Sequence, residues 1–291
     1  MELNQRTKGV LCILSAALFF AGMNTFVRLA GDLPVFEKAF FRNFIAAIMS
    51  VILIRKQHVP LYLGKGNVKY VVLRAAFGTL GLLFNFYAVD HLALADANML
   101  NKLSPFFAII FSYFLLKERV KPVQAVAVIG AFIGALCIIR PTGQNLQTLP
   151  AVLGFFSGMF AGAAYTCLRK ATSNGAQGPV VVLFFSCFSC IAVLPFIAMD
   201  FVMPTARQLV MLLLCGICGA GGQFSITAAY TFAPAKEISI YDYSQVIFSA
   251  VIGYFLFSQL PDALSFVGYA LIISMAVLNF VYHNRFEKDG A

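Results

Sequence analysis

The chain has 291 residues, of which 60% are hydrophobic and only 11% are charged, and its formal net charge is +9. Soluble domains average about 25% charged and about 45–50% apolar residues, so this composition excludes an ordinary water-soluble fold. Apolar runs of about 20 residues recur along the chain, and this is the length that a helix needs to cross the hydrocarbon core of a bilayer. We therefore predict an all-α, multi-pass membrane protein.

In chain order, the apolar runs between charged or Pro/Gly-rich breaks predict ten transmembrane helices. The connecting segments are mostly short, so we expect no soluble domain. The first run has no small-residue cleavage site, and we expect it to be a span rather than a cleaved signal. The predicted spans cover residues 9–30, 34–54, 69–89, 95–116, 121–139, 149–170, 178–199, 207–230, 236–258 and 262–283.

The basic residues indicate how the spans are oriented. Most of the 21 Lys and Arg residues lie on segments that share one side of the membrane with the N-terminus, whereas Arg28, Arg140 and Arg207 lie on the other side. Because cytoplasmic loops are enriched in Lys and Arg, we expect both termini in the cytoplasm. A compact chain without targeting extensions favours a plasma (bacterial inner) membrane. This distribution accounts for the positive charge without a nucleic-acid partner.

A weak internal repeat divides the chain into two five-helix halves, residues 1–141 and 142–291. A shift of 141 positions pairs Gly78 with Gly219 and Gly81 with Gly222, and it also aligns the Tyr-Phe-Leu triplets that begin at residues 113 and 254. Because five is odd, the second half must enter the membrane from the opposite side, so the two repeats are inverted. Inverted repeats are typical of secondary transporters, which open one central site alternately to each side.

Four short motifs stand out in the first half: Phe40-Phe41-Arg42, Leu73-Arg74, Leu103-Ser104-Pro105 and Lys117-Glu118-Arg119. With these motifs and its two five-helix halves, nearly the whole chain resembles the drug/metabolite transporter superfamily, in its ten-helix EamA-type branch. The resemblance implies that helices 1–4 and 6–9 surround a central cavity, whereas helices 5 and 10 are peripheral. The second half departs from the pattern, with Val246 in place of Pro105 and Ser258-Gln259 in place of Lys117-Glu118.

Polar side chains inside the spans are the candidates for solute binding, because such groups are costly in lipid. The fourth span carries Asn98, Asn101, Lys102 and Pro105 on one helical face, and Pro105 leaves the carbonyl of Asn101 without its helical donor. This face is suited to lining a solute path. The alternative interpretation is that the amides join helices and that the lysine reaches the membrane surface.

The ninth span repeats this pattern, because the shift of 141 positions places Ser239, Asp242 and Tyr243 opposite Asn98, Asn101 and Lys102. Counted along straight helices, Lys102 and Asp242 lie at similar depths from opposite surfaces. We therefore expect two separate polar layers with the substrate between them, rather than a direct ion pair between Lys102 and Asp242.

Arg42 is expected to share the upper layer with Lys102, while Asp242, Tyr243 and Tyr241 form the lower one. Cationic groups above and a carboxylate below are suited to a zwitterion, or to an organic anion with an amine or hydroxyl group. The alternative is that Arg42, like Arg74, is an internally paired structural charge.

Three further side chains are assigned candidate roles. Asp242 is the candidate for proton coupling, because a carboxylate in a low-dielectric environment can alternate between charged and neutral forms. Tyr87 and Tyr165 are candidates for stacking or hydrogen bonding to the solute, although many membrane tyrosines are interfacial anchors.

Two apparent catalytic signals are discounted. His91 and Asp96 match the spacing of a membrane-acyltransferase motif, but they fall in a short loop that is predicted to face outward, with no catalytic domain beside them. The Cys-x-x-Cys pairs at residues 187/190 and 215/218 lie inside apolar spans, where small side chains favour packing over zinc binding. We expect no catalytic residue, metal or cofactor.

Glycines at four-residue spacing allow helices to approach closely. Gly154, Gly158 and Gly162 lie on one face of the sixth span, and Gly130 and Gly134 in the fifth span are a candidate homodimer contact. Taken together, the pattern predicts a secondary-active transporter of a small polar or amphipathic metabolite, such as an amino acid, a carboxylate or a nucleoside-like compound.

Overall fold

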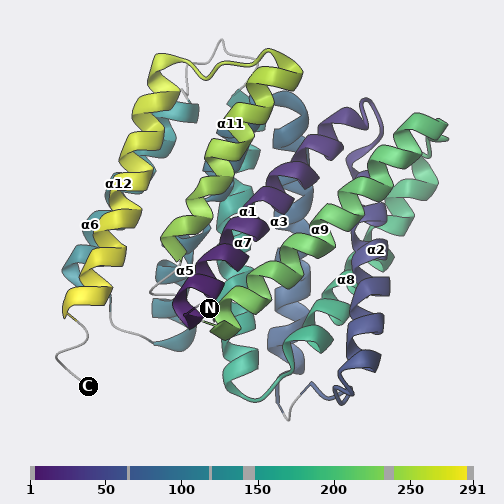
Figure 1. Cartoon of the computed structure of the whole chain (residues 1–291), viewed down its shortest axis with the longest axis horizontal. Helices are drawn as coiled ribbons and strands as arrows, with labels where there is room; N and C mark the ends of the chain where they lie inside the picture. Colours follow the sequence, from purple (N-terminus) through teal and green to yellow (C-terminus); the bar gives the residue numbers. More distant parts are fainter. Residues whose placement is uncertain (1–3, 64–65, 118–119, 140–147, 233–238, 287–291) are drawn as a thin grey trace.

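The computed structural model describes residues 4–63, 66–117, 120–139, 148–232 and 239–286, and every regular element in these ranges is helical (Figure 1). The elements of the first half are α1 (Gln5–Leu29), α2 (Val35–Lys56), α3 (Val68–His91), α4 (Leu94–Asn101), α5 (Ser104–Phe111), a π-helical turn η1 (Ser112–Leu116) and α6 (Pro122–Ile139). Those of the second half are α7 (Thr148–Ser173), α8 (Gly178–Met199), α9 (Ala206–Phe232), a 3₁₀ turn η2 (Ser239–Tyr243), α11 (Ser244–Phe257) and α12 (Ala263–Phe286).

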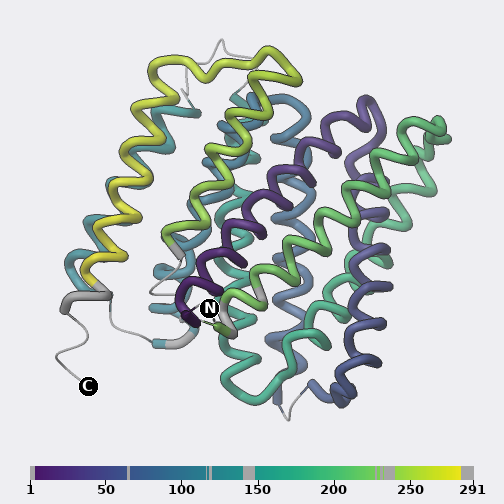
Figure 2. Tube along the Cα trace, viewed as in Figure 1, coloured from purple at the N-terminus to yellow at the C-terminus, as the bar shows by residue number. Residues whose placement is uncertain are grey.

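Ten segments cross the membrane, as the apolar runs predict. Eight helices within the described residues are long and apolar enough to do so. The other two segments are α2, which is of full length but carries Glu37, Lys38 and Arg42 in its first turns, and the fourth span, which is broken. The beginning of α1 and the end of α12 lie at the same end of the bundle (Figure 2), as an even number of crossings requires.

The expectation of one continuous helix over residues 95–116 is wrong, because the fourth span breaks after Asn101 and restarts at Ser104. Pro105 lies in the first turn of α5, where its missing N–H costs nothing, whereas the same proline inside a helix would crowd the carbonyl four residues earlier. The ninth span changes from the 3₁₀ turn η2 to the α-helix α11 at the equivalent place, between Tyr243 and Ser244.

The helix contacts have two-fold symmetry. In the repeat, α1, α2 and α3 correspond to α7, α8 and α9. The contact between α1 and α9 therefore has its equivalent in the contact between α7 and α3, and the contact between α2 and α9 has its equivalent in that between α8 and α3. In the pairs α2–α8 and α6–α12, each helix contacts its own counterpart in the other half. The fourth and ninth spans also end on left-handed residues 141 positions apart, Lys117 and Ser258, with φ of 56° and 52°. The fold is therefore two inverted five-helix repeats.

The glycine face of α7 lets this helix lie directly against the broken fourth span. A Cβ on Gly158 would be 2.6 Å from the carbonyl oxygen of Leu100, and one on Gly162 would be 2.7 Å from that of Ser104. At the repeat-related positions, a Cβ on Gly81 of α3 would be 3.2 Å from the backbone of α7, and one on Gly222 of α9 would be 2.7 Å from the Phe20 ring of α1. Small residues thus fix the spacing of the inner helices.

The peripheral helices α6 and α12 pack on each other at one edge of the bundle (Figure 1). A Cβ on Gly130 would be 2.6 Å from Met275 Sδ, and one on Gly134 would be 2.9 Å from the carbonyl oxygen of Gly268. The proposed use of Gly130 and Gly134 as a dimer contact is therefore wrong, because α12 of the same chain already occupies this face.

Replacing Gly158 by alanine should destabilise the protein by about 1–3 kcal/mol, because the new methyl group collides with the backbone of α4 rather than with a movable side chain. The measurement is the melting temperature of the purified protein in detergent. Gly178→Ala is the matched control, because no atom lies within 4 Å of the Cβ position at the start of α8. Equal melting temperatures for the two variants would contradict the close α4–α7 contact.

Candidate functional site

A cavity of about 120 Å³ lies between the two halves. Its described lining comes from α1, α2, α3, α4, α7, α8, α9 and the segment from η2 into α11, whereas no described residue of α6 or α12 lines it. This arrangement confirms the central cavity and the two peripheral helices that the family resemblance implies. Five of the predicted site residues line the cavity: Arg42, Asn101, Lys102, Tyr165 and Asp242.

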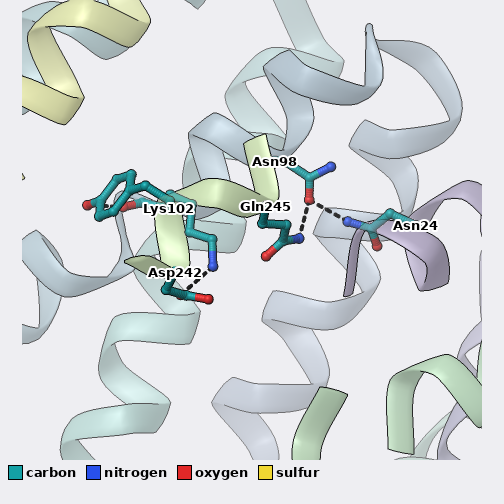
Figure 3. A network of polar contacts seen from close by, with 6 residues as sticks. Asn24, Asn98, Lys102, Asp242 and Gln245 are labelled. Atoms are coloured by element: carbon teal, nitrogen blue, oxygen red, sulfur yellow. Dashed lines mark hydrogen bonds and ion pairs between the residues drawn. The ribbon is translucent and has the colours of Figure 1, made fainter. Parts of the chain in front are cut away.

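Lys102 and Asp242 form a direct ion pair across the boundary of the repeats, and their charged groups point at each other in Figure 3. The expectation of two separate polar layers is therefore wrong. Counting depth along straight helices failed for two reasons: the fourth span breaks and the ninth changes from 3₁₀ to α-helix at this point, and a lysine side chain extends far beyond its own backbone. An unpaired ammonium or carboxylate at this depth would cost several kcal/mol, which favours the pair.

The break in the fourth span is stabilised by the ninth. The hydroxyl of Tyr243 donates to the main-chain oxygen of Lys102 at 3.1 Å, which satisfies a carbonyl near the end of α4. Asn101 donates to the hydroxyl of Ser157 on α7 at 3.1 Å. The broken span is thus bonded to both of its neighbours in the second half.

Asn98 is the centre of a buried amide network beside the cavity (Figure 3). Its Oδ1 accepts from Asn24 on α1 and from Gln245 on α11, each at 2.6 Å. Its Nδ2 donates to the Ser249 hydroxyl at 2.9 Å and to the Leu94 carbonyl at 2.7 Å. With both amide atoms satisfied and no exposed surface, Asn98 joins three helices.

Arg42 and Arg74 reach the same part of the cavity wall from α2 and α3. Their guanidinium carbons lie 5.7 Å and 4.4 Å from the ring centroid of Phe185 on α8. Arg42 also donates to Asn43 Oδ1 at 2.7 Å. Among the described residues no carboxylate pairs with either arginine, which is contrary to the interpretation of these arginines as internally paired charges.

Tyr87, Tyr241 and Tyr243 were also predicted as site residues, but they do not line the cavity. The ring of Tyr87 stacks on His91 with centroids 4.2 Å apart, and Tyr241 is exposed without lining the cavity. Tyr243 lies behind the wall, bonded to the fourth span as described above. The backbone of Ser239 belongs to η2, but its side chain lies outside the described part of the structure.

Several lining residues were not predicted as site residues, among them Asn24, Gln245 and Phe185. Gln245 follows Asp242 by three residues, and Asn24 is an amide within an apolar run, so both carried a polar signal that could have been used. Phe185 carried none, because it is one of 31 phenylalanines in an apolar chain.

The acyltransferase motif is not assembled. His91 Nδ1 lies 2.8 Å from the carbonyl oxygen of Tyr87, whereas Asp96 accepts from the hydroxyl of Tyr269 at 2.6 Å. A catalytic histidine needs its carboxylate on the ring nitrogen that orients it, and each member of this pair has another partner. The four cysteines of the Cys-x-x-Cys pairs carry free thiols.

Comparison with known proteins identifies the class of activity. The profile of the EamA-like transporter family matches residues 7–140 and again residues 148–281. The pseudopaline exporter of Pseudomonas aeruginosa is 32% identical over 94% of this chain and 96% of its own length. The riboflavin transporter of Vibrio cholerae is 25% identical over 91% and 90%. A solved crystal structure with 16% identity covers 97% of this chain and 100% of its own, with a TM-score of 0.69, and supports the fold.

Removing one charge of the Lys102–Asp242 pair should destabilise the protein by about 3 kcal/mol, because the remaining charge is left buried without a partner. Lys102→Met and Asp242→Asn should each lower the melting temperature in detergent. The double variant, with neither charge, should recover most of that loss.

Lys56→Met is the control for the loss of a lysine, because Lys56 is exposed at the end of α2. Additive effects of the two single changes would show that the pair contributes no coupling energy.

Proposed function

Because the chain belongs to the EamA-like transporter family, we propose that it is a secondary-active transporter that carries a small polar metabolite by alternating access. The observation that supports this most directly is the polar cavity at the boundary of the repeats, lined by charged and amide side chains from both halves. Buried ionisable groups around a cavity are not expected in a static scaffold, because burying each of them in a membrane costs free energy.

Alternating access is supported by contacts that close one end of the bundle. Arg28 donates to the carbonyl of Leu92 at 2.5 Å and to Oε1 of Gln259 at 3.2 Å, which joins the ends of α1, α3 and α11. Lys38 pairs with Asp90 at 2.7 Å and joins α2 to α3 at the same end. In the proposed topology this end faces outward, so this conformation is closed to the outside. Exchanging the conformations of the two halves would open it.

The names of the relatives indicate transport but no common solute. They describe an exporter of pseudopaline, a riboflavin transporter and, in Rickettsia bellii, an S-adenosylmethionine uptake transporter. We propose an amino acid, a carboxylate or a nucleoside-like compound as the solute of this chain, with Asp242 as the proton-coupling group. Transport that is independent of a proton gradient in the native protein would exclude that coupling role.

The test of transport is counterflow in liposomes that contain the purified protein. Vesicles are loaded with unlabelled leucine, succinate or uridine, one for each proposed class, and diluted into a trace of the same labelled compound. A secondary transporter should accumulate label transiently for at least one of the three, because exchange needs no net driving force. Protein-free liposomes and the Lys102→Met/Asp242→Asn variant are the controls. Failure of all three solutes to exchange would contradict this proposal.

We propose that the protein resides in a bacterial inner membrane with both termini in the cytoplasm. The test is labelling by a membrane-impermeant maleimide in cells, after the seven native cysteines have been replaced by serine or alanine. Arg207→Cys, exposed at the start of α9, should be labelled in intact cells. Lys56→Cys should be labelled only after permeabilisation. The reverse pattern would overturn this orientation.

A further inference from the structure

We propose that the cavity binds an organic dianion, with Arg42 and Arg74 as the residues that receive its two oxyanion groups. The inference rests on the proposed transport function and narrows its solute from a general polar metabolite to one chemical class. Succinate, a short dicarboxylate, represents this class.

The two guanidinium groups are buried and incompletely bonded. Arg42 is 5% exposed and Arg74 is 6% exposed, and both line the cavity. The Nε atoms of both arginines have no hydrogen-bond partner. The face of Phe185 offsets part of the cost, since a cation over an aromatic ring gains about 0.5–2 kcal/mol. That gain is less than the several kcal/mol that burying a charge costs, so both groups are suited to an anionic ligand.

The charge of the cavity favours two negative charges over one. Its described charged lining consists of three cations, Arg42, Arg74 and Lys102, and one carboxylate, Asp242. Asp242 is already paired with Lys102, so the two arginines carry the charges that are not compensated. A dianion would neutralise them, whereas the ammonium group of a zwitterion would find its only nearby described carboxylate already occupied.

A glycine at equivalent positions of the two repeats leaves space for each arginine side chain. A Cβ on Gly78 would be 2.1 Å from Arg74 Nη1 and 2.9 Å from the Phe185 ring, so only glycine leaves room for this side chain to lie along α3. A Cβ on Gly219 would be 3.1 Å from Arg42 Nε. Gly78 and Gly219 are the pair that the shift of 141 positions aligns. Each half thus provides one glycine that makes space for one arginine.

The two distances to Phe185 limit how far apart the two arginines can bind a ligand. Both lie over the ring of Phe185, so their guanidinium carbons are no further apart than the sum of the two distances to its centroid, about 10 Å. Guanidinium binds carboxylate or phosphate oxygens through two parallel N–H groups. Two oxyanion groups separated by a short carbon chain can therefore contact both arginines within the 120 Å³ cavity.

The first experiment measures binding to the purified native protein in detergent by the shift in melting temperature, because a ligand that binds the folded state stabilises it by mass action. The probes are succinate, its monoamide, its diamide, glycerol 3-phosphate and leucine. Succinate should stabilise most, the monoamide at least tenfold more weakly, and the diamide and leucine not at all. Stabilisation by glycerol 3-phosphate alone would assign the arginines to a phosphate ester, whereas stabilisation by leucine or the diamide but not by succinate would overturn the proposal.

The second experiment uses Arg42→Gln and Arg74→Gln. Each should weaken succinate binding at least tenfold, while the melting temperature without ligand stays equal or rises, because an uncompensated buried charge has been removed. A structural role predicts the reverse, with a lower melting temperature and unchanged affinity. Arg74→Lys keeps the charge but loses the planar fork, and it should bind succinate more weakly than the native protein. Arg207→Gln, exposed at the start of α9, is the control and should leave binding unchanged.

The outcomes separate this inference from the transport function itself. Counterflow of leucine or uridine without succinate would leave the protein a transporter and would refute the dianion site. Counterflow of succinate that survives in Arg42→Gln and Arg74→Gln would place the anion elsewhere in the cavity and would also refute the assignment. Counterflow of succinate that is lost in both variants and retained in Arg207→Gln is the expected result.

Discussion

A charge buried in a membrane needs a partner, and this constraint shapes the centre of the molecule. Lys102 and Asp242 come from opposite halves of the chain, and each satisfies the other where neither could remain alone at low cost. The pair holds the broken fourth span against the ninth, and the Tyr243 hydroxyl and the Asn98 network bind the same two segments. The site and the contact between the repeats are therefore one structure.

The same constraint distinguishes two kinds of polar group in the interior. Asn98 has every amide atom bonded and no exposed surface, so it contributes to the rigidity of the wall. Arg42 and Arg74 line the cavity without a carboxylate partner among the described residues, and the Nε atom of each is buried without a hydrogen bond. Burial alone therefore does not separate structural from binding residues, and the hydrogen bonds and charge partners of each side chain have to be considered with it.

The fold could be predicted from apolar runs and an odd number of helices in each repeat, because membranes permit few ways to satisfy a backbone. The break at residues 102–103 could be predicted only in part. Pro105 indicated that the helix is disturbed, but a kink and a full break have the same sequence signal. The Lys102–Asp242 contact was predicted wrongly, since depth along an ideal helix ignores both breaks and side-chain length. The role of Phe185 could not be predicted, because stacking depends on which helices become neighbours.

The inverted arrangement limits how similar the two halves can remain. Near a two-fold axis each segment faces its own counterpart in the other half. Lys102 contacts Asp242 and Tyr243, and these two residues occupy the positions that correspond to Asn101 and Lys102 in the second repeat. Two unaltered copies of the first half would bring two ammonium groups together there with no carboxylate to receive them. The two halves therefore differ at this layer, whereas Gly78 and Gly219 are identical because each must leave room for an arginine.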